Sequence, residues 1–138
     1  MPDPILIYPD PAVAVRDLIR ERLGAHGGPY ADATVSTRLP ASADPRPYVC
    51  VATDGGTRTS RLDARDTVRV NVYDPDDGVA YQLAALIEGI ATAPPWPAGV
   101  RVILPRSRPY TTADPDTGEP LADLGLTASL APTQLTKD

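Results

Sequence analysis

The chain has 138 residues, of which 42% are hydrophobic and 22% charged, and its formal net charge is −5. This length and composition predict one globular domain, residues 1–138, and exclude a wholly disordered or fibrous chain. The acidic balance argues against tight binding to nucleic acid or to an anionic membrane, because both need clustered Lys or Arg.

A helix is predicted near the start of the chain. Asp10 suits the N-cap, Pro11 suits the first helical position, and apolar residues follow at helical spacing until Gly24. The helix carries three arginines among acidic residues: Arg16, Arg20 and Arg22. This pattern predicts a solvated face with local ion pairs.

Three strands are predicted next. Residues 34–39 alternate polar and apolar side chains, as a half-buried strand does, and residues 48–53 form an apolar run that is too short for a helix. We expect the second of these to be a central strand. Asp54-Gly55-Gly56 predicts a turn, and residues 66–73, with valines at every second position, give the clearest strand of the chain.

The second half of the chain predicts another helix and two strands. A turn over residues 74–78 leads into an apolar helical stripe from Val79 to Ile90, and the proline-rich residues 93–97 end that helix. Strands are predicted over residues 100–104 and 124–130 because short apolar runs lie between turn-forming residues there.

The segment between the last two strands, residues 105–123, is rich in Pro, Arg, Asp and Gly. It predicts a long proline-rich surface loop or an extended arm. The whole chain contains 17 Pro, which separate short elements. The expected fold is therefore α+β, with two helices packed on one face of a mainly antiparallel mixed sheet of about five strands.

Residues that carry common enzyme chemistry are scarce. The one His is His26, in a Gly-rich linker, and the one Cys is Cys50, whose place between two valines predicts a small buried residue. One Cys and one His cannot complete a zinc site, and the Asp-Gly turns lack the Glu of a calcium loop. Neither Gly-Gly pair precedes a phosphate-binding motif. We therefore expect no catalytic residue, no cofactor and no metal.

Binding to other proteins is the class of function that the sequence favours, and most candidate residues lie in the predicted arm. A proline-stiffened segment loses little conformational entropy when it becomes ordered at an interface. Trp96, held between prolines, has two interpretations: an exposed binding anchor, or the simpler role of a cover over the end of the sheet. The residues expected at a subunit or partner interface are Trp96, Arg106, Arg108, Tyr110, Asp114 and Asp116.

Several segments together resemble one known family. They are the helix 12–23, Arg38-Leu39-Pro40, the strand 47–51, and residues 67–73 followed by the helix 80–91. In this layout the chain resembles the tail terminator, or tail completion, proteins of long-tailed bacteriophages, in particular those of actinobacterial hosts. The resemblance covers most of the chain and includes no catalytic motif.

The resemblance implies a structural virion protein and not an enzyme. Its subunits would form a homo-oligomeric ring, a hexamer, that caps the tail tube, ends tail polymerisation and provides the head-tail joining surface. The partners would be copies of the chain, the tail tube protein and the head-tail connector or neck proteins, with DNA only in transit through the lumen. The protein would reside at the head-proximal end of the tail in the virion, and in the host cytoplasm during assembly.

No membrane partner is expected. No apolar stretch approaches the ~20 residues that span a bilayer, and residues 1–11 lack the pattern of a secretory signal.

Two other functions remain as alternatives. A head-tail connector or stopper protein of the neck would have a similar small α+β ring subunit. A function of another class is a monomeric domain that binds a small ligand, or a small enzyme that uses Asp54, Asp66 or Asp74 at strand ends as acid or base.

Overall fold

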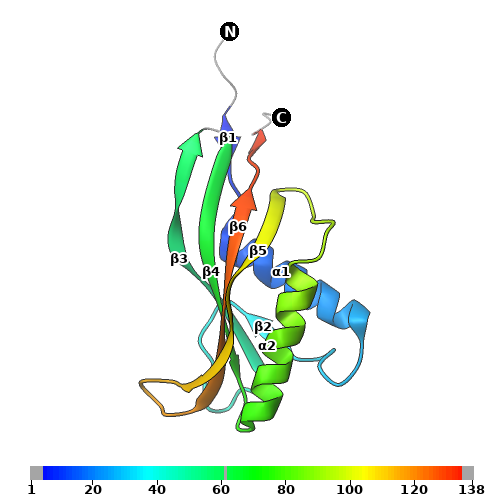
Figure 1. Ribbon diagram of the computed structural model, residues 1–138, viewed down its shortest axis with the longest axis vertical. Coiled ribbons are helices and arrows are strands. Elements are labelled where there is room, and N and C mark those ends of the chain that lie inside the picture. Colours follow the sequence, from blue (N-terminus) through cyan, green and yellow to red (C-terminus); the bar gives the residue numbers. More distant parts are fainter. Residues whose placement is uncertain (1–4, 61, 135–138) are drawn as a thin grey trace.

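The computed structural model describes residues 5–60 and 62–134 (Figure 1). The elements in chain order are β1 (Leu6–Ile7), α1 (Pro11–His26), β2 (Thr34–Ser36), β3 (Tyr48–Ser60), β4 (Asp63–Tyr73), α2 (Asp77–Ala91), β5 (Val100–Ala113), β6 (Pro120–Leu130) and β7 (Thr133–Gln134). The predicted α+β class is confirmed, with two helices and a mainly antiparallel mixed sheet of five strands in the described part of the chain.

The five-stranded sheet has the strand order β2-β3-β4-β6-β5. β2 and β3 are parallel, and the other neighbours are antiparallel. β3 therefore lies inside the sheet, as predicted for residues 48–53, and β5 forms one edge. The short strands β1 and β7 pair with each other in a separate sheet, which was not predicted because two residues carry no recognisable period.

Both helices pack on the same face of the sheet (Figure 1). α1 begins as predicted, since the Asp10 carboxylate accepts hydrogen bonds from the backbone N–H of Ala12, at 2.9 Å, and of Val13, at 3.3 Å. The helix continues through Gly24 and is capped by Gly27, whose φ of 75° is a conformation that glycine adopts readily. Neither of the described helices is long and apolar enough to cross a membrane.

The core lies between the helices and the sheet. Alternate residues of each strand point to opposite faces, so every second side chain of the inner strands enters the core. The fully buried side chains include Val15, Ile19, Leu83 and Ile87 from the helices, and Val49, Val51, Val68, Val70, Leu124 and Leu126 from the strands. The opposite face of the sheet, which we call the open face, carries neither described helix.

The arginines of α1 differ from their prediction. Arg16 makes the expected local ion pair, 2.9 Å from Asp17. Arg20 instead donates to the backbone carbonyl of Val35. Arg22 donates to carbonyls at and beyond the end of α2, those of Ile90, Ala93 and Pro95. The prediction of local ion pairs was wrong for these two arginines, because their acceptors are backbone carbonyls distant in sequence, whereas Arg20 is exposed as predicted.

The turn predicted at Asp54-Gly55-Gly56 is wrong. β3 runs through these residues to Ser60, and its register with β4 shifts between Thr53 and Gly56, which marks a β-bulge. Gly55 has a φ of 95°, and a Cβ added to Gly56 would lie 2.1 Å from the carbonyl oxygen of Arg65. A bulge needs glycine for the same reasons as a turn, so the sequence pattern alone did not separate the two.

The first predicted strand, residues 34–39, is shorter than expected. β2 covers Thr34–Ser36, and Leu39, predicted to face the core, is 70% exposed. The hydroxyl of Tyr48 donates a hydrogen bond to the carbonyl of Arg38, which fixes the chain just after it leaves the sheet.

The segment 105–123, predicted as a long loop or arm, is a β-hairpin. Residues 105–113 belong to β5, residues 120–123 belong to β6, and a turn over residues 114–119 joins them. The prediction of a loop was wrong because the two strands stay paired along this segment, with register shifts around Ser107. The hairpin projects away from the helices (Figure 1). We call residues 105–123 the hairpin arm, and residues 114–119 the arm turn.

Candidate functional site

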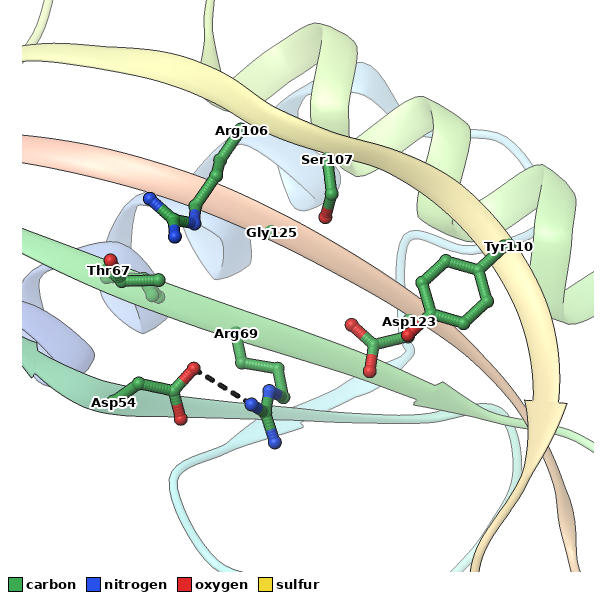
Figure 2. Close-up of a pocket in the computed structure, with 9 residues that line it drawn as sticks. Asp54, Thr67, Arg69, Arg106, Ser107, Tyr110, Asp123 and Gly125 are labelled. Atoms are coloured by element: carbon green, nitrogen blue, oxygen red, sulfur yellow. Dashed lines mark hydrogen bonds and ion pairs between the residues drawn. The ribbon is translucent and has the colours of Figure 1, made fainter.

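The open face of the sheet contains a hollow that side chains from β3, β4, β5 and β6 surround (Figure 2). Its volume is about 570 Å³. The lining residues are Asp54, Thr67, Val68, Arg69, Arg106, Ser107, Tyr110, Asp123 and Gly125. Most of these side chains are polar, and both charge signs occur among them. We call this site the hollow.

The floor of the hollow depends on a glycine. Gly125 of β6 lies opposite Arg69 of β4 and opposite Ser107 of β5. A Cβ added to Gly125 would lie 2.5 Å from the Ser107 hydroxyl oxygen. The absence of a side chain at Gly125 therefore lets Ser107 lie across β6.

The hollow contains two arginines, of which one is paired with a carboxylate and the other is not. The Arg69 guanidinium lies 3.0 Å from the Asp54 carboxylate, and both side chains are about half exposed, which makes this a weak surface pair. The side chain of Arg106, exposed on β5, has no hydrogen-bond or ion-pair partner among the described residues. Figure 2 shows it reaching over β6 on the Thr67 side of the hollow. Arg106 is therefore available to an external acidic group.

Asp123 forms the more enclosed acidic part of the hollow. Burial raises the pKa of its carboxyl, while the charge of Arg69 and a hydrogen bond with Tyr110 oppose that rise. Asn71 lies opposite Asp123 in the sheet, and its side-chain oxygen is buried without a hydrogen-bond partner in the described part of the chain. Two oxygen acceptors in partly desolvated places, one lining the hollow and one beside it, therefore lie on neighbouring strands.

Four buried residues form a small apolar cluster on the open face, next to the hollow. It consists of Tyr48, Cys50, Tyr73 and Leu121, each 4% exposed or less. Burial raises the pKa of the Cys50 thiol, which lowers the fraction of reactive thiolate. The prediction that Cys50 is a small buried residue is confirmed.

The arm is fastened to this cluster by Arg46. Its guanidinium binds the Glu119 carboxylate through two contacts, Nε at 2.6 Å and Nη2 at 2.9 Å, and stacks over the ring of Tyr48. It also donates to the carbonyls of Ala41 and Asp44. Hydrogen bonding to Glu119 raises the pKa of Arg46. One side chain therefore holds the loop before β3 and the arm turn together.

The contact between Tyr73 and the arm turn, which we call the junction, should make the stability of the fold depend on pH. Its hydroxyl is 3.2 Å from a carboxylate oxygen of Asp114, and burial, with the charge of Asp114, raises its pKa to about 12. A raised pKa means that the folded state holds the proton more tightly, so this contribution to stability is complete below pH about 10 and is lost between pH 10 and 12.

The prediction is tested by following phenolate absorbance through an alkaline titration of the wild-type protein and of Tyr73→Phe. The difference between the two curves should show one tyrosine with a midpoint near the raised value. A difference centred near the ordinary tyrosine pKa would contradict the junction described here.

The predicted interface residues occupy four places. Arg106 and Tyr110 line the hollow, and Arg108 is exposed further along β5. Asp114 and Asp116 lie in the arm turn. Trp96 is half-buried after α2, packs against the core and donates its indole N–H to the carbonyl of Ala91, at 2.9 Å. This geometry favours the interpretation of Trp96 as a cover over the core.

The three carboxylates considered for acid-base chemistry do not meet at one site. Asp54 lines the hollow, and Asp66 lines a smaller depression with Gly56 and Thr57. Asp74, at the other end of β4, is 8% exposed and accepts a hydrogen bond from the backbone N–H of Asp76. Among the described residues, no three His, Cys, Asp or Glu side chains are placed to hold a metal ion.

Several residues of the hollow were not singled out from the sequence: Thr67, Arg69, Ser107 and Asp123. For two of them a signal existed, because Thr67 and Arg69 alternate with the buried residues Val68 and Val70 and must face the other way. The others join the site only through the pairing of β5 with β6.

No family model matches the sequence, and no curated protein matches it either.

Proposed function

We propose that the chain is the subunit of a tail terminator of a long-tailed bacteriophage. In this proposal six copies form a ring that caps the tail tube, ends its polymerisation and provides the surface to which the head attaches. The ring resides at the head-proximal end of the tail in the virion and assembles in the host cytoplasm. The observation that carries the proposal is the projecting hairpin arm.

The arm has the properties of a segment that contacts another protein. β5 has 14 residues, yet only Val100 and Ile103 of this strand are buried. Leu104 and Tyr110 are 53% and 52% exposed. The inner strand of the arm is paired with β4 and buries Leu121 and Ala122, so it is the outer strand, residues 105–113, whose exposed side chains a partner would cover.

The exposed edge of β5 favours side-chain contacts over sheet extension. Pro105 and Pro109 have no backbone N–H to donate, and prolines in an edge strand oppose pairing with a further strand. Contacts between different surfaces of identical subunits close into a ring when the rotation permits. A ring built by such an arm would therefore be defined by side-chain complementarity.

The other proposed partners follow from the same role. One end of the ring would bind the tail tube protein and the other the head-tail connector or neck proteins. DNA would pass through the lumen with weak contact, since a net charge of −5 per chain releases few counterions from phosphates.

The ring is tested by the mass of the purified protein in solution, measured by light scattering over a range of concentrations. The expected result is a hexamer, or a monomer that becomes a hexamer when tail tube protein is added. A protein that remains monomeric at every concentration and ignores tubes would contradict the proposal.

A second candidate is favoured by the hollow itself. A monomeric domain could bind a small ligand with both charge signs there, because Arg106 and Asp123 lie on its two sides (Figure 2). Thermal unfolding of a monomeric protein with a series of small zwitterions would separate the two functions. A ligand-dependent rise in Tm that Arg106→Ala removes would favour this candidate.

A further inference from the structure

We propose that the hollow of one copy of the chain binds the arm turn of the next copy, with Asp116 of the turn meeting Arg106 of the hollow. This inference rests on the proposed ring and names the contact that would close it. It follows from three observations: an unpaired arginine, an unpaired carboxylate, and the distance between them within one chain.

The hollow offers one unpaired cation. Asp54 pairs with Arg69, and Asp123 lies near the charge of Arg69 and hydrogen bonds with Tyr110, so the one positive charge of Arg69 is already shared by two carboxylates. Arg106 lies apart from them (Figure 2). An exposed guanidinium can bind a carboxylate through two parallel hydrogen bonds.

The arm turn offers one unpaired anion. Asp114 accepts hydrogen bonds from the backbone N–H of Asp116, at 2.8 Å, and of Thr117, at 3.1 Å, and from Tyr73. Glu119 is bound to Arg46. The exposed side chain of Asp116 makes no hydrogen bond or ion pair with the described residues. It is therefore the carboxylate that the turn presents outwards.

The turn is also shaped in advance. The N–H of Asp114 donates to the carbonyl of Glu119, and the N–H of Gly118 donates to the carbonyl of Asp114, both at 2.8 Å. Gly118 has a φ of 75°, as a tight turn requires. A turn that is already ordered loses little entropy on binding.

The two groups cannot meet within one copy. Arg106 and Asp116 belong to the same hairpin, and the strand from Arg106 to the end of β5 alone spans roughly 20 Å at the rise of an extended chain. A contact between them must join two copies. Each copy carries one turn and one hollow on different parts of its surface, so in the proposed ring the turn of each copy enters the hollow of the next, and the heterologous contact repeats until the ring closes.

Charge reversal at both groups tests the contact. Asp116→Arg and Arg106→Asp are each expected to raise the protein concentration at half-assembly by about tenfold or more, because attraction is replaced by repulsion at every interface. An equimolar mixture of the two variants should assemble again, since the reversed turn of one fits the reversed hollow of the other. The double variant should also assemble.

Matched controls make the same charge changes elsewhere. Asp32→Arg and Arg38→Asp alter exposed residues outside the arm and the hollow, and both should assemble like the wild type. At protein concentrations below those of assembly, all variants should keep the wild-type Tm, since none of the changed side chains makes a described contact within one copy.

The outcomes separate this inference from the proposed function. Loss of assembly in the single variants with recovery in the mixture supports the contact. If the wild type forms a ring and both single variants form it equally well, the proposed contact is wrong and the proposed ring stands. A wild-type protein that stays monomeric overturns the ring and the contact together.

Discussion

Replacing Arg22 by Ala is expected to lower the free energy of unfolding by about 2 kcal/mol, because a hydrogen bond from a charged donor contributes about 1.5–3 kcal/mol and the removed group satisfies several acceptors. The Arg22 guanidinium binds the carbonyls of Ile90, at 2.7 Å, and Ala93, at 2.6 Å, and that of Pro95. The positive charge also lies at the negative end of the α2 dipole. Arg22 thus joins α1 to the C-terminal end of α2 and to the residues that follow it.

The measurement is chemical denaturation, with Arg16→Ala as the matched control on the same helix. Arg16 makes only an exposed pair with its neighbour Asp17 among the described contacts, so this control should change the unfolding free energy by about 0.5 kcal/mol or less. Arg22→Lys, which keeps the charge and loses the forked geometry, should fall between the two. Equal effects for Arg22→Ala and Arg16→Ala would contradict the assigned role.

Replacing Arg46 by Ala is expected to cost about 2–3 kcal/mol, between the cost of an exposed pair and that of a buried pair. Its side chain is 17% exposed and that of its partner Glu119 is 24% exposed. The change would leave the Glu119 carboxylate without its forked partner and uncover one face of the Tyr48 ring.

The loss should also be local, which hydrogen exchange can detect. Amides of the arm turn and of the loop before β3 should exchange faster in Arg46→Ala, while those of β4 stay protected, since the core is not altered. Arg46→Lys should recover part of the protection. Unchanged exchange in the arm turn would show that Arg46 does not fasten the arm.

The sequence predicted the elements that carry an apolar period. Both helices and the strand with Val68 and Val70 were found because their buried side chains recur at every turn or at every second residue. The outer part of β5, residues 105–113, is predicted as a loop because the segment 105–123 is rich in Pro, Arg, Asp and Gly and shows no apolar alternation. Pairing with β6, which a single strand's sequence does not reveal, keeps this segment extended.

The candidate site was predictable only in part. The arm and its charged residues were singled out because Pro, Arg and Asp gather there. The hollow was not, because it forms only when residues of β3, β4, β5 and β6 are brought together on one face of the sheet. The register shifts around Ser107 decide which side chains of β5 face Asp123, and a bulge has no unique sequence signature.

The central claim is that the exposed arms join copies of the chain into a ring on the tail tube. Such a ring can be detected without an atomic structure of the tube protein. Electron microscopy of tail tubes grown with and without the protein is the most direct measurement. We expect the protein to form a ring at one end of each tube and capped tubes to stop growing. Tubes that keep the same length distribution and carry no added density at either end would contradict it.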